Sequence, residues 1–183
     1  MRVIEENTLE KEMQKFEYRN GIYEGEAINN VPNGNGKVTW EDDIYYEGGF
    51  LNGSFHGYGI CHQGDFLHLE GIWNNHDFVE GKAVYGSDWM PCGYETGSIY
   101  EGKFEELLMV GKGKIIRKSG EIYEGNTLNG KPHGKGKLTC RDGTVIVGTW
   151  TNGNKDYEYT DEDYENAGGD ERFAKHNYTE YIE

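Results

Sequence analysis

Apolar and polar residues alternate along short stretches of this chain in a way that predicts β-strands. Side chains alternate between the two faces of a strand, so residues two apart share a face. Tyr46–Phe50 and Tyr100–Phe104 each present Tyr, Gly and Phe to one face, and Leu69–Trp73 presents Leu, Gly and Trp. The residue after the Tyr is usually Glu and points to the other face. A second strand is expected after each of these, with an apolar residue fifteen positions after the start: Val38, Val84, Ile115 and Leu138.

The strand pattern recurs at a fixed period. Tyr-Glu-Gly begins at Tyr23, Tyr46, Tyr100 and Tyr123, and degenerate copies begin at Leu69 and Ile146. Four of the five steps between these starts are 23 residues long, and the step from Leu69 to Tyr100 is 31. A fixed period of about 20 to 50 residues is typical of a repeat array. Because a single hairpin is only marginally stable in water, several copies are expected to stack.

Turn signals and glycines sit at fixed positions within each copy. Asn-Gly pairs at Asn52, Asn129 and Asn152 predict tight turns between strands. Glycine recurs two, eleven and thirteen positions after the start of most copies. A glycine within a strand costs about 0.5–1 kcal/mol relative to alanine, so its repetition indicates a positional need. The missing Cβ lets a neighbouring aromatic ring lie over the backbone.

These motifs resemble a known repeat family. Tyr-Glu-Gly, then Asn-Gly, then His-Gly-x-Gly at His56 and His133 is similar to the MORN repeat, the membrane occupation and recognition nexus, over about residues 16–153. The resemblance implies an all-β fold, a single-layer, curved and twisted antiparallel sheet of successive hairpins with an aromatic-lined groove. The third copy departs from the pattern, since Leu69 replaces Tyr and the following step is longer. We therefore expect a less regular surface in the middle of the array.

The segment before the array, residues 1–15, carries a helix signal. Asn7 has Glu10 three residues later, which is a capping-box pattern. Leu9, Met13 and Phe16 would then share one helical face. A short helix capping the first sheet edge is predicted, with a strand beginning near Phe16.

Two other segments also break the repeat. The loop at 86–97 is an insertion in which Trp89 and Tyr94 either pack back onto the sheet or anchor a partner. Residues 154–183 form an acidic, Tyr-rich tail. Spacing within this tail predicts a helix over about 170–182, and a partly disordered solvated tail is the alternative.

Composition limits the kind of core and of partner. Among 183 residues, only 35% are hydrophobic, 28 are Gly and 14% are aromatic, so aromatic rings are expected to supply most of the buried area. The net charge is −15, divided into −11 for residues 1–99, +3 for 100–145 and −7 for 146–183. This acidity disfavours nucleic acid as a partner. The three cysteines share no repeat position, and no signal-peptide pattern or apolar span is present, which favours a reduced, cytoplasmic protein.

No catalytic grouping stands out. His56 and His133 occupy the same repeat position, and Cys61, His62 and His68 have no second ligand pair at zinc spacing. The sequence also lacks a P-loop, a nucleophile elbow and a dinucleotide-binding fingerprint. We therefore expect no enzymatic activity, no catalytic residue, no cofactor and no metal.

Two binding hypotheses remain. In the first, the chain is a scaffold or adaptor whose aromatic groove receives a helix or extended segment of a protein. The resemblance implies cytoskeletal, motor or ciliary assemblies as its setting and allows a homodimer through the array ends. The predicted groove residues are Tyr23, Tyr46, Phe50, Trp73, Tyr100, Phe104, Tyr123 and Trp150.

In the second hypothesis, the chain binds phosphoinositides or a membrane surface, as the family name suggests. Its support is the basic stretch at 103–141, because a basic residue near an anionic leaflet contributes about 1 kcal/mol. Overall acidity opposes it. The predicted contacts are Lys112, Lys114, Arg117, Lys118, Lys135 and Lys137.

Overall fold

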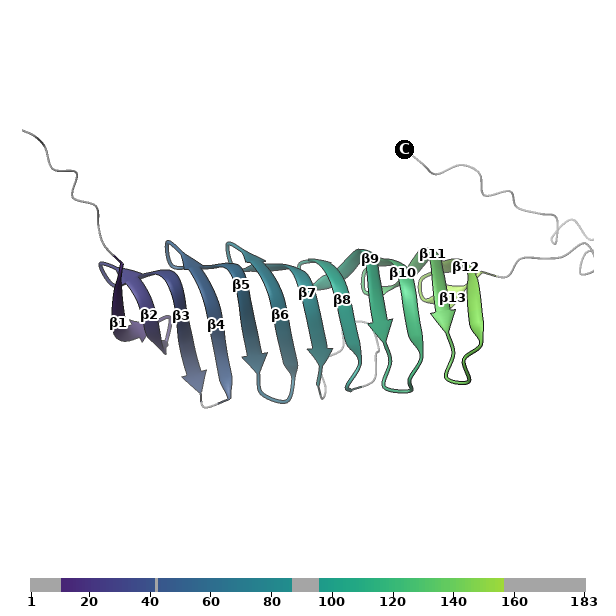
Figure 1. Cartoon of the computed structure of the whole chain (residues 1–183), viewed down its shortest axis with the longest axis horizontal. Coiled ribbons are helices and arrows are strands. Elements are labelled where there is room, and N and C mark those ends of the chain that lie inside the picture. Colours follow the sequence, from purple (N-terminus) through teal and green to yellow (C-terminus); the bar gives the residue numbers. More distant parts are fainter. Residues whose placement is uncertain (1–10, 42, 87–95, 157–183) are drawn as a thin grey trace, which may run out of the picture.

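The protein folds as a row of antiparallel strands (Figure 1), seen here in a computed structural model that describes residues 11–41, 43–86 and 96–156. Each strand pairs with the strands before and after it, so the order in the sheet is the order in the chain. The strands are β1 (Glu12–Tyr18), β2 (Gly21–Ile28), β3 (Val31–Glu41), β4 (Ile44–Leu51), β5 (Ser54–Gln63), β6 (Leu67–Asn74), β7 (Asp77–Tyr85), β8 (Ile99–Glu105), β9 (Leu108–Ile116), β10 (Ile122–Leu128), β11 (Lys131–Thr139), β12 (Val145–Thr151) and β13 (Asn154–Lys155). The predicted all-β sheet of successive hairpins is confirmed.

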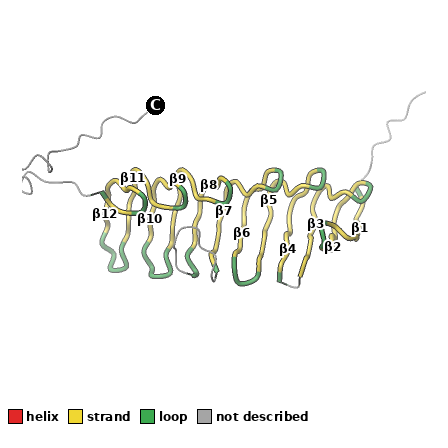
Figure 2. Tube along the Cα trace, turned by 180° about the vertical axis from the view of Figure 1, so that it is seen from behind, coloured by secondary structure: helices red, strands yellow, loops and turns green. Residues whose placement is uncertain are grey.

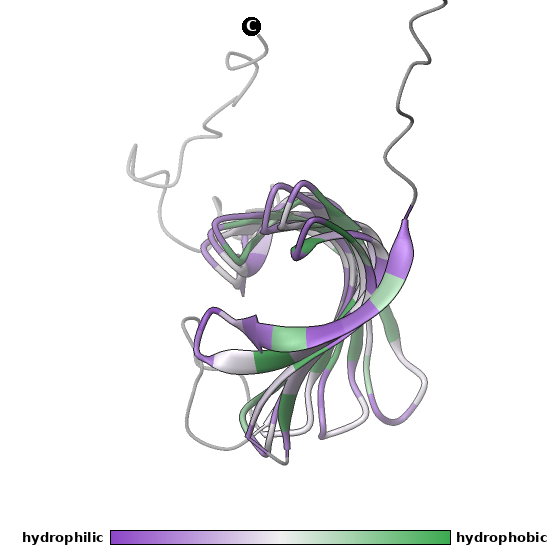
Figure 3. Cartoon of the chain, turned by 90° about the vertical axis from the view of Figure 1, so that its left-hand side faces the viewer, coloured by the Kyte–Doolittle hydropathy of each residue, from purple (hydrophilic) through white to green (hydrophobic). Residues whose placement is uncertain are grey.

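The sheet is a single layer that curls around its long axis. Figure 2 shows strands joined by short turns, and Figure 3, viewed along the row, shows the strands bending into an open arc. Only the concave side of such an arc can be covered by the sheet's own side chains. The buried residues all lie on that inner face: Tyr23, Tyr46, Phe50, Trp73, Tyr100, Phe104, Tyr123 and Trp150 are among them. No described helix is long and apolar enough to cross a bilayer.

The predicted turns form where the asparagines recur. Asn29, Asn52, Asn75, Asn129 and Asn152 all have φ between 49° and 51°, and the residue after each also has positive φ. Two successive positive φ values define the type I′ turn, whose twist matches that of the flanking strands. Backbone bonds also link successive hairpins. The amide of Gly53 donates to the carbonyl of Pro32 at 2.8 Å, and that of Gly153 to Pro132 at 2.8 Å.

Two of the described tight turns lack Asn at the first position, Arg19–Asn20 and Glu106–Leu107, and the second of them is strained at both residues. Glu106 and Leu107 have φ of 50° and 63°, where side chains longer than Asn are disfavoured. Replacing Glu106 with Asn is therefore expected to raise the free energy of unfolding by about 0.5–1 kcal/mol. Leu107 is left unchanged because it packs against the core. Urea unfolding measures the gain, and the reciprocal change Asn129→Glu in the next turn should cause a similar loss. A destabilised Glu106→Asn variant would contradict the argument.

The third copy is one residue shorter between its paired glycines. Gly71 pairs with Gly81, whereas Gly48 pairs with Gly59 in the copy before it. As a result Ala83 faces inward and is fully buried, and Val84, unlike Val38, faces outward. The irregularity expected in the middle of the array therefore consists of this shift, by which the residue fifteen positions after the copy start lies on the outer face instead of the inner one.

The N-terminal prediction of a helix is wrong for the residues that the structure describes. Residues 12–15 belong to β1, which pairs with β2 from Glu12↔Ala27 to Tyr18↔Gly21. The physical reason is that β2 would otherwise have an unpaired edge, and that Phe16 packs on Tyr23 with ring centroids 5.2 Å apart. Pairing and ring contact outweigh a local helix signal. Residues 1–10 lie outside the described residues, as do the loop at 87–95 and the predicted C-terminal helix at 170–182.

Candidate interaction surface

The eight predicted groove residues do come together, but as a core. Each is at most 5% exposed. The rings interlock in pairs, with centroids 5.2 Å apart for Tyr46 and Phe50 and 5.0 Å apart for Tyr100 and Phe104. The expectation of an uncovered aromatic groove is therefore wrong, because these side chains pack on one another as the core of the curled sheet. Partner binding by these side chains stays a prediction, but they offer no free apolar surface.

The four repeat tyrosines each satisfy their hydroxyl inside this core. Each hydroxyl donates to the carbonyl three residues later, for example Tyr23 to Glu26 at 2.6 Å and Tyr123 to Asn126 at 2.8 Å. Burial raises the pKa of Tyr23 to about 12, and burial also raises the pKa of Tyr46, Tyr100 and Tyr123. The hydroxyls therefore stay protonated at neutral pH, and their role is structural.

The outer face carries a ladder of opposite charges. Between most neighbouring strands an acidic side chain lies directly opposite a basic one, as in Lys15–Glu24 at 3.0 Å and Lys37–Glu47 at 3.2 Å, and only Ile60 and Val147 interrupt the pattern in the described strands. We call this row the charge ladder. Its successive positions are Lys15, Glu24, Lys37, Glu47, Ile60, Glu70, Lys82, Glu101, Lys114, Glu124, Lys137 and Val147. Such exposed pairs contribute little stability, but like charges at a slipped register would be unfavourable.

Beside the charge ladder, two residues along each strand, lies a row of mostly apolar side chains. Val84 pairs with Ile99, Ile99 with Ile116, and Ile116 with Ile122, and all four are half-buried. We call this line and its extensions the outer row. Its cross-strand order is Tyr45, His62, His68, Val84, Ile99, Ile116, Ile122, Thr139 and Val145. Within the described part of the chain, no second layer covers this face.

Comparison with known sequences identifies the repeat. The sequence model of the MORN repeat matches residues 23–43, 46–66 and 123–145, which are three of the copies that form hairpins in the structure. The chain is a MORN-repeat protein. A stretch of 102 residues is also 28% identical to alsin from Rattus norvegicus, which amounts to 52% of this chain and 6% of alsin. The chain thus spans only a small part of that relative. MORN repeats are a non-catalytic family that generally mediates protein or membrane interactions.

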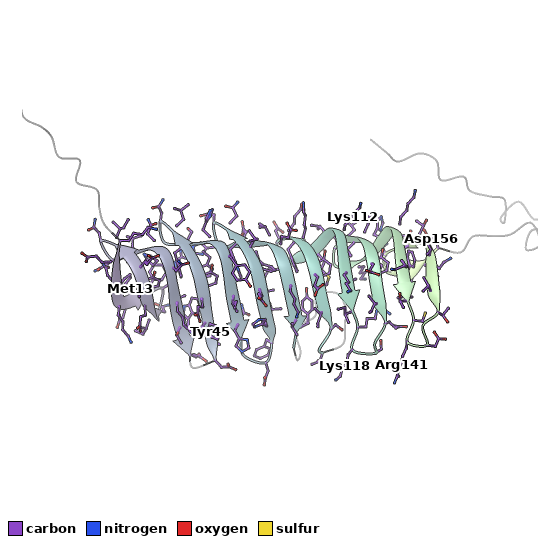
Figure 4. The ribbon with its side chains drawn as sticks, viewed as in Figure 1. Met13, Tyr45, Lys112, Lys118, Arg141 and Asp156 are labelled. Carbon is purple, nitrogen blue, oxygen red and sulfur yellow. The ribbon has the colours of Figure 1, made fainter. Side chains whose placement is uncertain are left out.

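The basic stretch does not gather on one patch of the MORN sheet. Lys112 and Lys118 lie toward opposite ends of the strands, and Arg141 lies toward the same strand ends as Lys118 (Figure 4). Two of the cations have acidic partners: Arg117 pairs with Glu121 at 2.9 Å, and Lys137 with Glu124 at 2.6 Å. Lys114 lies in the charge ladder between Glu101 and Glu124. Lys135 is exposed on β11, two residues before the ladder residue Lys137. The basic residues that are close together in the sequence are therefore spread over different parts of the folded sheet.

The histidines near Cys61 form a hydrogen-bonded pair on the outer row of the MORN array. His62 Nδ1 lies 3.2 Å from His68 Nδ1, and His62 Nε2 lies 3.1 Å from Asp43 Oδ1. Burial and the neighbouring His62 lower the pKa of His68. Cys61 is buried on the opposite face. In the described ranges no group of three or more potential ligands is placed to hold a metal ion. The remaining predicted anchors, Trp89 and Tyr94, lie outside the described residues.

Sequence reasoning missed the two outer rows of the MORN sheet, although both leave a signal. The charge ladder follows from Glu one position after each copy start and Lys fourteen positions after it, as in Glu124 and Lys137. The outer row follows from the residue just before each start, such as Tyr45, Ile99 and Ile122. These positions look like unremarkable strand residues until the register shows that they are neighbours.

Proposed function

We propose that this MORN protein is a non-catalytic scaffold that binds a protein partner on the outer face of its sheet, along the outer row. The observation that carries the proposal is the line Val84–Ile99–Ile116–Ile122, four adjacent β-branched side chains on the face turned away from the core. Contiguous apolar surface rimmed by polar residues is typical of interaction sites. As part of the proposal, we expect a cytoplasmic setting in a cytoskeletal, motor or ciliary assembly, as in similar small proteins of the family.

The outer row suits binding better than the inner face does. The inner aromatics are already packed on one another, so a partner could reach them only by opening the core. The outer row instead lies on a rigid, hydrogen-bonded sheet, so binding would order little of the scaffold itself. The neighbouring charge ladder offers regularly spaced Lys and Glu side chains, which can set register and exclude wrong partners.

Membrane binding through the basic stretch is the second candidate, and the geometry supports it less. An anionic leaflet needs several free cations on one surface. Here Arg117 and Lys137 have carboxylate partners, and Lys112 and Lys118 lie toward opposite strand ends.

A pair of matched variants tests the proposal. Ile99→Glu with Ile116→Lys removes two apolar side chains from the outer row but introduces opposite charges directly across the strands, so the sheet and the net charge are preserved. The control Tyr58→Lys with Ile72→Glu makes the same kind of change at an exposed cross-strand pair on the outer face, on the far side of the charge ladder from the outer row. We expect affinity capture from source cells, read by quantitative mass spectrometry, to lose a near-stoichiometric partner with the first variant and keep it with the control.

Folding must be checked alongside binding. Urea unfolding midpoints of both double variants are expected to stay close to that of the unchanged protein, because all four positions face outward and each variant pairs opposite charges across the strands. If the folded Ile99→Glu/Ile116→Lys protein retained every partner, the outer row would be excluded as the binding surface. If partners were lost only with the control, the part of the outer face around Tyr58 and Ile72 would take its place.

A further inference from the structure

The loops bordering the outer row differ in charge from one half of the array to the other. The end of β3 and the β3–β4 and β5–β6 loops expose Glu41, Asp43 and Asp65, whereas the β9–β10 and β11–β12 loops expose Lys118 and Arg141 with one acidic residue, Asp142. In Figure 4, Lys118 and Arg141 lie toward the same strand ends as Tyr45, which belongs to the outer row. A segment lying along the row would therefore meet acidic side chains first and basic ones later.

The same polarity holds for the array as a whole. Residues 11–86 contain twelve acidic and five basic residues, a net charge of −7. Residues 96–156 contain seven acidic and ten basic residues, a net charge of +3. The charge ladder is internally balanced, so it does not cancel this difference. The outer row thus runs across a sheet that is negative over β1–β7 and positive over β8–β12.

The spacing along the outer row favours a helix over an extended strand. Neighbouring strands lie about 4.8 Å apart, so from Val84 to Ile122, over β7–β10, the row presents an apolar side chain about every 4.8 Å. A helix with an apolar seam every 3.5 residues repeats about every 5.3 Å at 1.5 Å per residue. An extended chain presents same-face side chains about every 6.7 Å, which falls out of step within two strands. Only a helix keeps its apolar side chains nearly aligned with those of the row over several strands.

We infer that the outer row docks an amphipathic helix of a partner protein, basic toward its N-terminal end and acidic toward its C-terminal end, running from β5 to β11. This inference rests on the proposed function and adds the partner's chemistry and direction. The helix dipole favours the same direction, because its positive N-terminus then lies near Asp43 and Asp65 and its negative C-terminus near Lys118 and Arg141. Six strand intervals of about 4.8 Å correspond to a helix of about 19 residues. The twist of the sheet limits a straight helix to about this length.

A peptide selection tests the inference directly. The full chain is used to select from displayed 19-residue peptides that have fixed Leu or Ile at seam positions and random Lys or Glu at the flanking positions. Counter-selection uses the Ile99→Glu/Ile116→Lys protein, which lacks the apolar centre of the row. We expect the enriched peptides to carry Lys in the N-terminal half and Glu in the C-terminal half.

Affinities of one enriched peptide then check the direction. Fluorescence anisotropy should give binding to the full chain that weakens about ten-fold when the order of Lys and Glu in the peptide is reversed. Lys118→Glu with Arg141→Glu should weaken the original peptide by a similar factor and strengthen the reversed one. Lys112→Glu with Lys131→Glu makes the same change of charge at exposed residues toward the other strand ends, so it serves as the control and should leave both affinities nearly unchanged.

Two results would overturn the inference, and neither coincides with failure of the proposed function. No enrichment above the Ile99→Glu/Ile116→Lys protein would exclude a docked helix. Enrichment without any charge order would exclude the direction and the charge signature. If either occurred while captured partners still depended on Ile99 and Ile116, the outer row would bind a partner of different chemistry, and the proposed function would stand.

Discussion

Replacing Trp73 with alanine is expected to lower the free energy of unfolding by about 3–5 kcal/mol, since a large buried ring is removed and a cavity remains. Trp73 is 5% exposed and touches rings from three strands, with centroid distances of 5.3 Å to Tyr46, 5.7 Å to Phe55 and 5.0 Å to Phe78. Its indole nitrogen also donates to the carbonyl of Gly59 at 3.0 Å, a bond that alanine cannot make. A loss of this size is a large share of the 5–15 kcal/mol typical of a domain.

The neighbouring residue provides the control for this measurement. Ile72 lies on the same strand but faces outward and is 45% exposed. Ile72→Ala is expected to cost less than about 1 kcal/mol in urea unfolding, because little buried area is lost. Equal losses for the two variants would mean that the inner face is not a packed core. The m-value should be compared as well, because an array of repeats can lose cooperativity when one copy is weakened.

The loss of unfolding free energy expected for Trp73→Ala affects how partner binding must be tested in this protein. An alanine variant of an inner aromatic residue that loses a partner would report unfolding as readily as a broken contact. Outer-row substitutions separate the two effects, because Ile99 and Ile116 carry no core contact that the fold depends on. Measuring the free energy of unfolding of each variant alongside its binding then shows whether a partner is lost because the protein unfolds or because a contact is removed.

The sequence predicts the hairpins well because each repeat position has one dominant local cause. Asn at the turn adopts positive φ readily, and Gly two residues after the Tyr pairs with the Gly of the next strand, as Gly48 does with Gly59. Alternation then assigns Tyr46 and Phe50 to one face. These rules act over a few residues, so they can be applied without knowing the rest of the fold.

Exposure of the aromatic face could not be predicted in the same way. A flat single layer would leave the row of Trp73 and Phe104 exposed to solvent, whereas in the curled sheet both are buried and Phe78, on the strand between them, packs on both rings at 5.0 Å and 4.8 Å. Curvature is a sum over many strands, with bulges such as the one between Gly48 and Phe50, and no single stretch encodes it. The start of β1 at Glu12, where the sequence predicts a helix with a strand only from near Phe16, has a related cause, since the pairing of β1 depends on the free edge of β2.

The second large effect is expected at Gly59, where alanine should destabilise the fold by about 1–3 kcal/mol through overpacking. The backbone there is ordinary strand, so the cause is the space above it. A Cβ built on Gly59 would lie 2.6 Å from Cζ and 2.7 Å from Cε2 of the Tyr46 ring. That ring cannot move aside, because it is fully buried and stacked on Phe55 with centroids 3.8 Å apart.

A double-mutant cycle separates the ring from other causes of the loss at Gly59. In a Tyr46→Leu background the ring is absent, so adding Gly59→Ala should cost far less than it does in the unchanged protein, with a coupling of at least about 1 kcal/mol. Gly57→Ala is the comparison for backbone strain, because Gly57 has φ of 77° and open space around its Cβ position. Additive losses at Tyr46 and Gly59 would show that the glycine is required by something other than the tyrosine lying over it. Strong coupling would explain why Gly36, Gly113 and Gly136 recur at the same position, each beneath the tyrosine of its own copy.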